Sequence, residues 1–308
     1  MSDPGRQRIL VIKLGALGDL VQAFGPFQAI RDHHGSAHIT LLTTAPVAAL
    51  AEASSWFDDV WIDNRPGWWQ PGGWLALAAR LKAAEFARVY DLQTSGRSNL
   101  YYQIMGSPKP EWSGIAAGCS HPHANPGRDD MHTVERQAEQ LRMAGIEPIP
   151  APDLDWFDAT IDSFGLDGPF VLLAPGGALH RPEKRWPGYA ELARRLAAKD
   201  MRPVLLGTAE EASVTAEIAA ECATALDLTD KTSLFHVAGL ARRAAAAVGN
   251  DTGPMHVTAA LGCSSLVLFS LASDPALCAQ RGPAVEILRR DDLATLGADE
   301  VEAALRLR

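Results

Sequence analysis

The feature that most constrains this fold is an alternation of short apolar stretches with longer amphipathic ones, which runs through the chain twice. A segment with three prolines, EPIPAP at 147–152, separates the two runs and cannot continue a helix. Alternating strands and helices indicate parallel sheets covered by helices. We therefore predict two Rossmann-like α/β domains, residues 1–150 and 151–308, whose parallel sheets face each other across a cleft. The last helix is free to pack back on the N-terminal domain.

The expected strands are short and rich in Ile, Val and Leu, as buried parallel strands usually are. They lie at 9–14, 38–44, 59–63, 88–93, 170–174, 203–207, 225–228, 245–249, 265–269 and 285–288. The expected helices lie at 20–31, 46–53, 75–84, 133–144, 186–198, 210–223, 233–243, 254–261 and 299–307. Ligands bind outside the carboxyl ends of parallel strands, so residues that directly follow a strand are the first candidates for a site.

Charge and composition restrict the class of protein. Lys and Arg number 28 against 37 Asp and Glu, which argues against a general nucleic-acid binder and makes any anion site local. The 4 cysteines are widely spaced, which indicates free thiols in a reducing compartment. No stretch has the roughly 18 uninterrupted apolar residues of a membrane span, and the polar start does not fit a signal peptide. We expect a cytoplasmic monomer and leave contact with a membrane surface open.

A glycine turn that contains an acid follows the first predicted strand. In the sequence GALGD at 15–19, Gly18 permits a tight turn and Asp19 stands where the next helix begins. Asp19 is therefore a candidate for chemistry at the edge of the sheet, and the alternative is that it only caps the helix. The turn lacks the G-x-G-x-x-G spacing of a dinucleotide site.

Two loops in the second half have the features of phosphate sites. The sequence PGG at 175–177 follows a strand and leads to Lys184, a cation placed before a helix, where the helix dipole favours acids instead. The sequence DTG at 251–253 follows another strand and opens a helix with a hydroxyl and accessible backbone N–H groups. The alternatives are an ordinary solvated loop and a capped helix start. Two such loops in one domain predict a bound diphosphate.

Three other groups of residues have a structural explanation that competes with a functional one. Tryptophans at 68–69 and Trp74 would suit a sugar or lipid platform, but we favour half-buried packing. The sequence CSHPH at 119–123, with His132 nearby, carries metal-capable side chains in a loop-like stretch, and we predict no metal there. The D-x-D at 153–155 lies in the linker and is interpreted as a solvated turn.

Four segments, taken in order, resemble the motifs of glycosyltransferase family 9, the ADP-heptose:lipopolysaccharide heptosyltransferases. They are ILVIKL with the GD at 18–19, HTVER at 132–136, the run from PG at 175 to KRWP at 184–187, and DTGPMH at 251–256. The resemblance covers nearly the whole chain. The sequence departs from the family's pattern at 269–275 and at 119–130.

The resemblance implies a GT-B fold and an inverting, metal-independent transfer without a cofactor. It implies Asp19 as general base, Lys184 as phosphate ligand, Thr252 and Gly253 at the diphosphate, and Asp251 at the heptose. The implied donor side further includes Gly18, Pro175, Gly176, Gly177, Thr229, Thr232 and His256. The acceptor side includes Arg65, Arg97, His132 and Arg136. The implied partners are a nucleotide-sugar and a lipid-linked glycan at the inner face of the inner membrane, where the protein would be peripheral.

Two rival functions remain open at this stage. One is an enzyme of related fold that uses another nucleotide-sugar or acceptor, such as an epimerase. The other is a two-lobed protein that binds a nucleotide-sugar without chemistry. Asp19 separates these readings, because a binding protein has no need of a base there.

Overall fold

A computed structural model describes residues 6–178 and 180–308 of the chain. The first five residues, part of the polar start, and Leu179 of the second glycine loop lie outside the described residues. The chain divides into two compact units, Met1–Asp153 and Leu154–Arg308. Among the described residues, none of the helices has the length and apolar character needed to span a bilayer.

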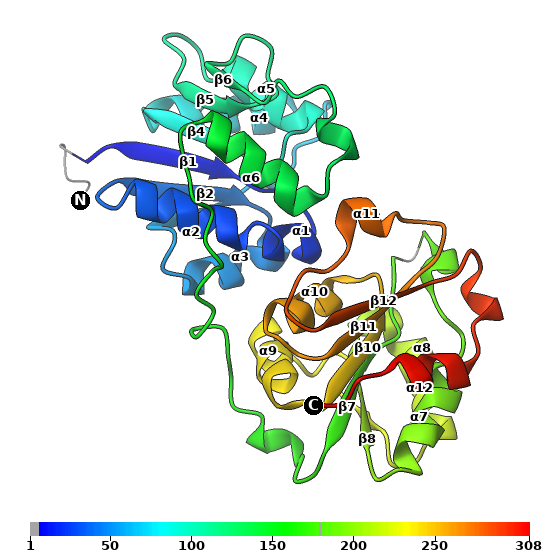
Figure 1. The fold of residues 1–308 in the computed structure, drawn as a ribbon. Helices are drawn as coiled ribbons and strands as arrows, with labels where there is room; N and C mark the ends of the chain where they lie inside the picture. Colours follow the sequence, from blue (N-terminus) through cyan, green and yellow to red (C-terminus); the bar gives the residue numbers. More distant parts are fainter. Residues whose placement is uncertain (1–5, 179) are drawn as a thin grey trace. The chain divides into compact units, whose positions relative to one another are not determined.

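Unit 1 is built on a parallel sheet in which the described strands follow the order β3-β2-β1-β4-β5-β6 (Figure 1). The strands are β1 (Arg8–Ile12), β2 (His38–Thr43), β3 (Asp59–Ile62), β4 (Arg88–Asp91), β5 (Glu111–Gly114) and β6 (His121–Pro122). After Arg8, the central strand β1 is an unbroken apolar run, and its residues from Ile9 to Ile12 are fully buried. Burial on both faces of the sheet explains why the sequence there shows no polar alternation.

The described helices of unit 1 are α1 (Leu17–Val21), α2 (Phe24–His33), α3 (Ala45–Ala53), α4 (Pro71–Ala83), α5 (Gly96–Ile104) and α6 (Thr133–Met143). The helix predicted at 20–31 is in fact two helices, because the backbone tightens where the Ala23 N–H bonds the carbonyl of Leu20. Helix α5 and strands β5 and β6 were not predicted. Helix α5 has few apolar residues in a helical pattern and begins instead with a capping box of Ser95 and Ser98.

Unit 2 repeats the architecture, with the order β12-β11-β10-β7-β8-β9 among the described strands. These are β7 (Phe170–Ala174), β8 (Arg202–Leu205), β9 (Leu226–Asp227), β10 (Ala246–Asn250), β11 (Ser265–Phe269) and β12 (Val285–Arg289). The helices are α7 (Tyr189–Ala197), α8 (Ala212–Glu221), α9 (Leu234–Arg243), α10 (Gly253–Ala260), α11 (Pro275–Cys278) and α12 (Ala298–Ala304). All strand pairs in both sheets are parallel, which confirms the predicted fold class.

The closing helix α12 packs within its own unit. Val301 is fully buried and belongs to the same apolar cluster as Leu192 and Leu196 of α7. The end of the chain is also held there, because the Arg308 guanidinium donates to the carbonyls of Ala241 and Ala244 at 2.7 Å each. The helix therefore completes the core of unit 2, a position that the sequence left open.

Candidate active site

The two predicted phosphate loops of unit 2 follow neighbouring strands. Strands β7 and β10 pair directly, with Ala174 opposite Gly249. The chain leaves β7 toward β8 on one side and leaves β10 toward β11 on the other. Such a reversal of strand order is the place where open parallel sheets bind their ligands. The fold therefore brings together two loops that lie more than seventy positions apart in the sequence.

Asn250 joins these two loops. Its side-chain amide donates to the carbonyls of Pro175 and Gly176 at 2.8 and 2.9 Å. Its side-chain oxygen accepts from the Trp186 N–H and the Tyr189 hydroxyl, both at 3.1 Å. Asn250 is fully buried, so each of these bonds replaces one to water. Sequence reasoning assigned no role to Asn250, and its position between Gly249 and Asp251 was the one signal that could have pointed to it.

Lys184 and Asp251 meet across the two loops. The Lys184 ammonium lies 2.6 Å from a carboxylate oxygen of Asp251, and the two side chains are 15% and 10% exposed. Lys184 ends a short turn, η3 (Pro182–Lys184), that precedes α7. The two residues that sequence reasoning assigned to a phosphate and a sugar therefore form an ion pair with each other.

Asp251 is also held by two residues that sequence reasoning missed. The Ser273 hydroxyl donates to it at 2.8 Å and the Gln280 amide donates at 3.0 Å. Burial opposes ionisation of Asp251, but the hydrogen bonds from Lys184, Ser273 and Gln280 outweigh it and lower the pKa of the carboxyl group. Ser273 lies in the segment 269–275 that departs from the family pattern, so no motif pointed to it.

The start of α10 supplies the second part of the predicted phosphate site. Thr252 is its N-cap residue, but its hydroxyl makes no capping bond. The hydroxyl oxygen is buried and unpartnered within the described chain, which leaves its hydrogen-bonding capacity unused. The backbone N–H groups that begin at Gly253 carry the positive end of the helix dipole. His256 lies in the next turn and is buried.

The glycines at 176 and 177 lie close to neighbouring side chains. A Cβ atom at Gly176 would lie 2.7 Å from the Glu211 side chain, and one at Gly177 would lie 3.3 Å from Arg185.

Thr229 follows β9, and its hydroxyl donates to that of Thr215 at 2.7 Å. This hydrogen bond holds the Thr229 side chain in place beside β8, and Thr232 follows Thr229 in the same loop.

In unit 1 the corresponding reversal of strand order lies between β1 and β4. Asp19 follows β1 and sits in the first turn of α1, whose N-cap residue is Ala16. The alternative that Asp19 is the helix cap is therefore wrong. A Cβ atom at Gly15 would lie 2.5 Å from Asp19, so the glycine leaves room for the acid. No group in the described chain donates a hydrogen bond to the Asp19 carboxylate.

Cationic groups surround Asp19. Lys13 is buried, and its ammonium donates to the carbonyl of Leu92 at 3.1 Å. Burial lowers the pKa of Lys13, and the negative charge of the nearby Asp19 opposes this. Arg136 of α6 also interacts with Asp19, while burial and the neighbouring Arg128 lower its pKa. The predicted base thus lies in a positive field, and Lys13 is a residue to which sequence reasoning assigned no role.

The other predicted acceptor residues are already engaged in the fold. The His132 ring caps α6 by accepting from the Val134 N–H at 3.2 Å. Arg65 donates to the carbonyl of Leu14, next to the glycine turn. Arg97 donates to the carbonyl of Pro66 at 2.9 Å. These two arginines fix the loop 63–70 to the site, rather than standing as free cations.

The metal-capable stretch at 119–123 forms a hydrogen-bonded network. The His123 ring lies 2.8 Å from Glu139, and Asn125 donates to the same carboxylate at 2.9 Å. Cys119 is turned toward the carbonyl of Gly114. Among the described residues, no group of three or more His, Cys, Asp or Glu side chains is arranged to hold a metal ion.

The tryptophans divide into two kinds. Trp74 packs against the core of unit 1 and donates to the carbonyl of Gly67 at 3.1 Å, as the packing interpretation predicted. That interpretation is wrong for the other two, because Trp68 is 86% exposed and Trp69 is 67% exposed. A polar loop with Pro66 and Gly67 holds them at the surface before α4 begins.

Comparisons with known proteins agree on one family. The sequence model of glycosyltransferase family 9 (heptosyltransferase) matches residues 74–292. Lipopolysaccharide heptosyltransferase 2 of Escherichia coli K12 is 35% identical over 299 residues, which covers 86% of this chain and 83% of that protein.

Solved structures show the same fold. A glycosyltransferase family 9 protein of Veillonella parvula has a TM-score of 0.81 at 19% identity, covering 97% of this chain and 95% of its own. The E. coli heptosyltransferase WaaC with ADP has a TM-score of 0.77 at 20% identity, covering 96% and 98%. The same protein was solved with ADP-2-deoxy-2-fluoro heptose. The predicted GT-B fold is confirmed, and the chain belongs to glycosyltransferase family 9, the heptosyltransferases.

Proposed function

We propose that the protein transfers heptose from ADP-heptose to the inner core of lipopolysaccharide, with inversion at the sugar and without a metal. The observation that carries this proposal is the Lys184–Asp251 pair between the glycine loop and α10, at the strand reversal of the second sheet. A relative named lipopolysaccharide heptosyltransferase 2 covers most of the chain, and WaaC binds ADP and an ADP-heptose analogue.

The donor is bound through its diphosphate. Lys184 and the N–H groups that begin α10 offset the phosphate charges, and the unused Thr252 hydroxyl donates to a phosphate oxygen. Lys184 then divides its ammonium protons between the diphosphate and Asp251. The other oxygen of Asp251, to which Gln280 donates, also accepts from heptose hydroxyls. The adenine lies along the loop that contains Thr229 and Thr232. Gly18 provides close backbone approach on the donor's sugar side.

In the transfer itself, a hydroxyl oxygen of the acceptor attacks the anomeric carbon of heptose from the face opposite the diphosphate. The new carbon–oxygen bond forms as the bond to the diphosphate breaks, and the hydroxyl proton passes to Asp19. ADP leaves with the electron pair, and its charge is compensated by Lys184 and the start of α10. Because no described residue donates a hydrogen bond to the Asp19 carboxylate, its oxygens are able to receive that proton.

The acceptor lies on the side of Asp19. Arg136 of α6 and His132, the N-cap residue of that helix, contact its anionic groups, and Arg65 and Arg97 hold the loop that borders it. Because an inner-core acceptor is linked to a lipid, the proposal places the protein at the cytoplasmic face of the inner membrane, as a peripheral monomer.

Replacement of Asp19 by asparagine tests the proposal. The rate of ADP release with an inner-core acceptor should fall by about 10²- to 10⁴-fold, the usual contribution of a general base. Affinity for ADP-heptose in calorimetry should stay within about twofold. Asp32→Asn is the matched control, because Asp32 is an exposed acid of the same unit that only accepts from Gln28. Normal turnover by the Asp19 variant would remove Asp19 from the mechanism.

The identity of the donor has a separate test. ADP-heptose, ADP-glucose, UDP-sugars and GDP-sugars are compared by the rise in melting temperature that each causes at equal concentration. ADP-heptose should give the largest rise, and Thr229→Trp should reduce it. A larger rise with a uridine or guanosine sugar would overturn the donor assignment while leaving the family unaffected.

A further inference from the structure

We propose that unit 1 docks on an anionic lipid bilayer through one surface. This surface, called the α4–α5 surface, consists of Trp68, Trp69 and the outer sides of helices α4 and α5. The proposal names the surface for the membrane contact that the proposed function implies, and it rests on that function for its lipid partner. Its test does not require the transferase activity.

The two exposed tryptophans are the first observation. Trp68 is 86% exposed and Trp69 is 67% exposed, and their rings meet edge to face with centroids 5.8 Å apart. An indole ring in water exposes a large apolar area, which soluble proteins seldom leave without a partner. Tryptophan is the residue that suits a bilayer interface, because its body is apolar and its N–H remains able to bond water.

The apolar area continues along two helices that lie side by side. The ring of Trp74, near the start of α4, lies 6.1 Å from the ring of Tyr101 in the second half of α5. Near their ends, a Cβ atom at Gly106 would lie 3.2 Å from the Lys82 side chain. Trp74, Leu77 and Leu81 belong to the core cluster, so the opposite side of α4 faces outward. Leu75 on α4 is 70% exposed and Leu100 on α5 is 50% exposed.

The charge of the same region is the second observation. Residues 64–84 and 92–110 contain no Asp or Glu, although the whole chain carries a formal net charge of −9. The cations in these two stretches are Arg65, Arg80, Lys82, Arg97 and Lys109. Among the described residues, none of the five forms an ion pair. A positive surface on an acidic protein complements the anionic lipids of a cytoplasmic leaflet, where each cation contributes about 1 kcal/mol.

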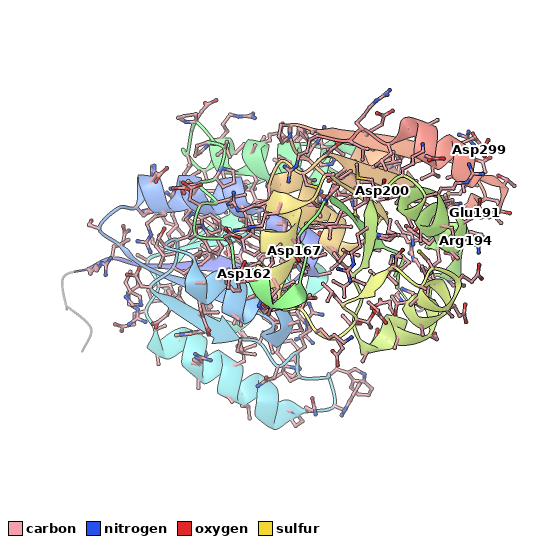
Figure 2. All side chains as sticks on the ribbon, turned by 90° about the horizontal axis from the view of Figure 1, so that it is seen from below. Asp162, Asp167, Glu191, Arg194, Asp200 and Asp299 are labelled. Carbon is pink, nitrogen blue, oxygen red and sulfur yellow. The ribbon has the colours of Figure 1, made fainter. Side chains whose placement is uncertain are left out.

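The exposed cations on and next to helix α7 of unit 2 are arranged differently. On α7, Arg194 lies 2.6 Å from Glu191, and Figure 2 shows the two side chains together on the outer side of the helix. Arg195 pairs with Glu191 at 2.8 Å, and Lys199 pairs with Glu302 at 2.7 Å. The exposed cations of α7 are therefore paired with acids, whereas those of the α4–α5 surface are not.

A bilayer fits this surface better than a single sugar does. The apolar side chains and the cations extend over two helices and a loop, whereas a sugar platform needs one accessible ring face. The loop also follows β3 at the carboxyl edge of the sheet, the edge that carries Asp19. Arg65 bonds the carbonyl of Leu14, so docking of the loop would bring the base of the proposed reaction toward lipid-linked acceptors.

The test is co-sedimentation of the purified full chain with sucrose-loaded vesicles. Vesicles of phosphatidylethanolamine with phosphatidylglycerol should bind the protein, and vesicles of phosphatidylcholine alone should bind it at least tenfold more weakly. Trp68→Ser with Trp69→Ser should weaken binding at least tenfold. Arg80→Gln with Lys82→Gln should weaken it about 30-fold, from about 1 kcal/mol per cation.

Two control variants lie on another helix of the same unit. Met143→Ser removes an exposed apolar side chain of α6, and Arg142→Gln removes an exposed cation. Both should bind vesicles as the wild type does, and circular dichroism should be unchanged for all variants. Failure of the wild-type protein to sediment with anionic vesicles would overturn the proposal. So would a tryptophan double variant that binds vesicles normally but loses affinity for a lipid-free core oligosaccharide, because the pair would then be a sugar platform.

Discussion

Replacement of Asn250 by alanine should destabilise unit 2 by about 4 kcal/mol. The change removes four hydrogen bonds from a fully buried side chain. The carbonyls of Pro175 and Gly176 and the N–H of Trp186 lose their partner, at about 1 to 3 kcal/mol for each buried group left unsatisfied. The Tyr189 hydroxyl loses less, because it also lies 3.4 Å from the carbonyl of Ala174. Because the surroundings partly collapse around the smaller alanine side chain, we expect the loss in free energy of unfolding to lie near the lower end of the summed penalties.

Urea unfolding followed by circular dichroism measures this loss. With an m-value of about 2 kcal/mol per molar urea, the midpoint for unit 2 should fall by about 2 M. Asn64→Ala, at an exposed position, is the control and should change stability by less than about 0.5 kcal/mol. ADP affinity should fall as well, because the glycine loop is no longer held to β10. An Asn250 variant as stable as the control would refute the view that this amide joins the two loops.

Asn250→Asp gives an isosteric version of the same experiment. The carboxylate would still accept from Trp186 and Tyr189, but it would face the carbonyls of Pro175 and Gly176 instead of donating to them. Its pKa in the folded protein should rise above the unfolded value, since the charged form is disfavoured. Its stability relative to wild type should therefore be best at acidic pH and should worsen as the pH rises through the folded pKa.

Three further predictions concern the charges of the site. Lys184→Ala should weaken ADP binding in calorimetry by about 1.5 to 3 kcal/mol. Adding Asp251→Asn should restore part of the lost affinity, because the acid would no longer repel the phosphate. Unchanged ADP affinity of the Lys184 variant would exclude Lys184 from the site. Burial raises the pKa of Asp91 from an ordinary value of 3.8 to about 6, so its ionisation costs the folded state up to about 3 kcal/mol. The stability of Asp91→Asn relative to wild type should therefore increase as the pH rises from about 4 to about 7, and a flat difference in urea titrations would contradict this. Transfer should continue at full rate in excess EDTA after dialysis, and a loss restored by one metal would show that the reaction depends on it.

Several elements could be predicted from the sequence because their residues are locally consistent. The strands at β1, β7, β10 and β11 are apolar runs, and the helix at α9 carries its own signal in the Ser233 capping box. The region of α5, β5 and β6 could not be predicted in this way. Its short strands are partly polar, and β6 has only two residues, so their structure depends on pairing with β4 and with each other.

The candidate site likewise has parts that could be predicted from the sequence and parts that could not. The motifs at 15–19, 175–187 and 251–256 indicated where phosphate and base chemistry would lie, because glycine turns and helix starts after strands are local features. Partners contributed by distant segments had no local signature. Ser273 and Gln280 reach Asp251 from beyond β11.

Taken alone, the sequence determined the class of fold, the family and the loops that carry the proposed chemistry, because hydrophobic period, glycine placement and motif order are written along the chain. The tertiary structure decided which loops are neighbours, which charges are paired and which aromatic side chains are left in water. Lys184 is an ion-pair partner and Trp68 is exposed for the same physical reason: burial and pairing depend on what the rest of the chain brings to a position, and residues far apart in the sequence supply it.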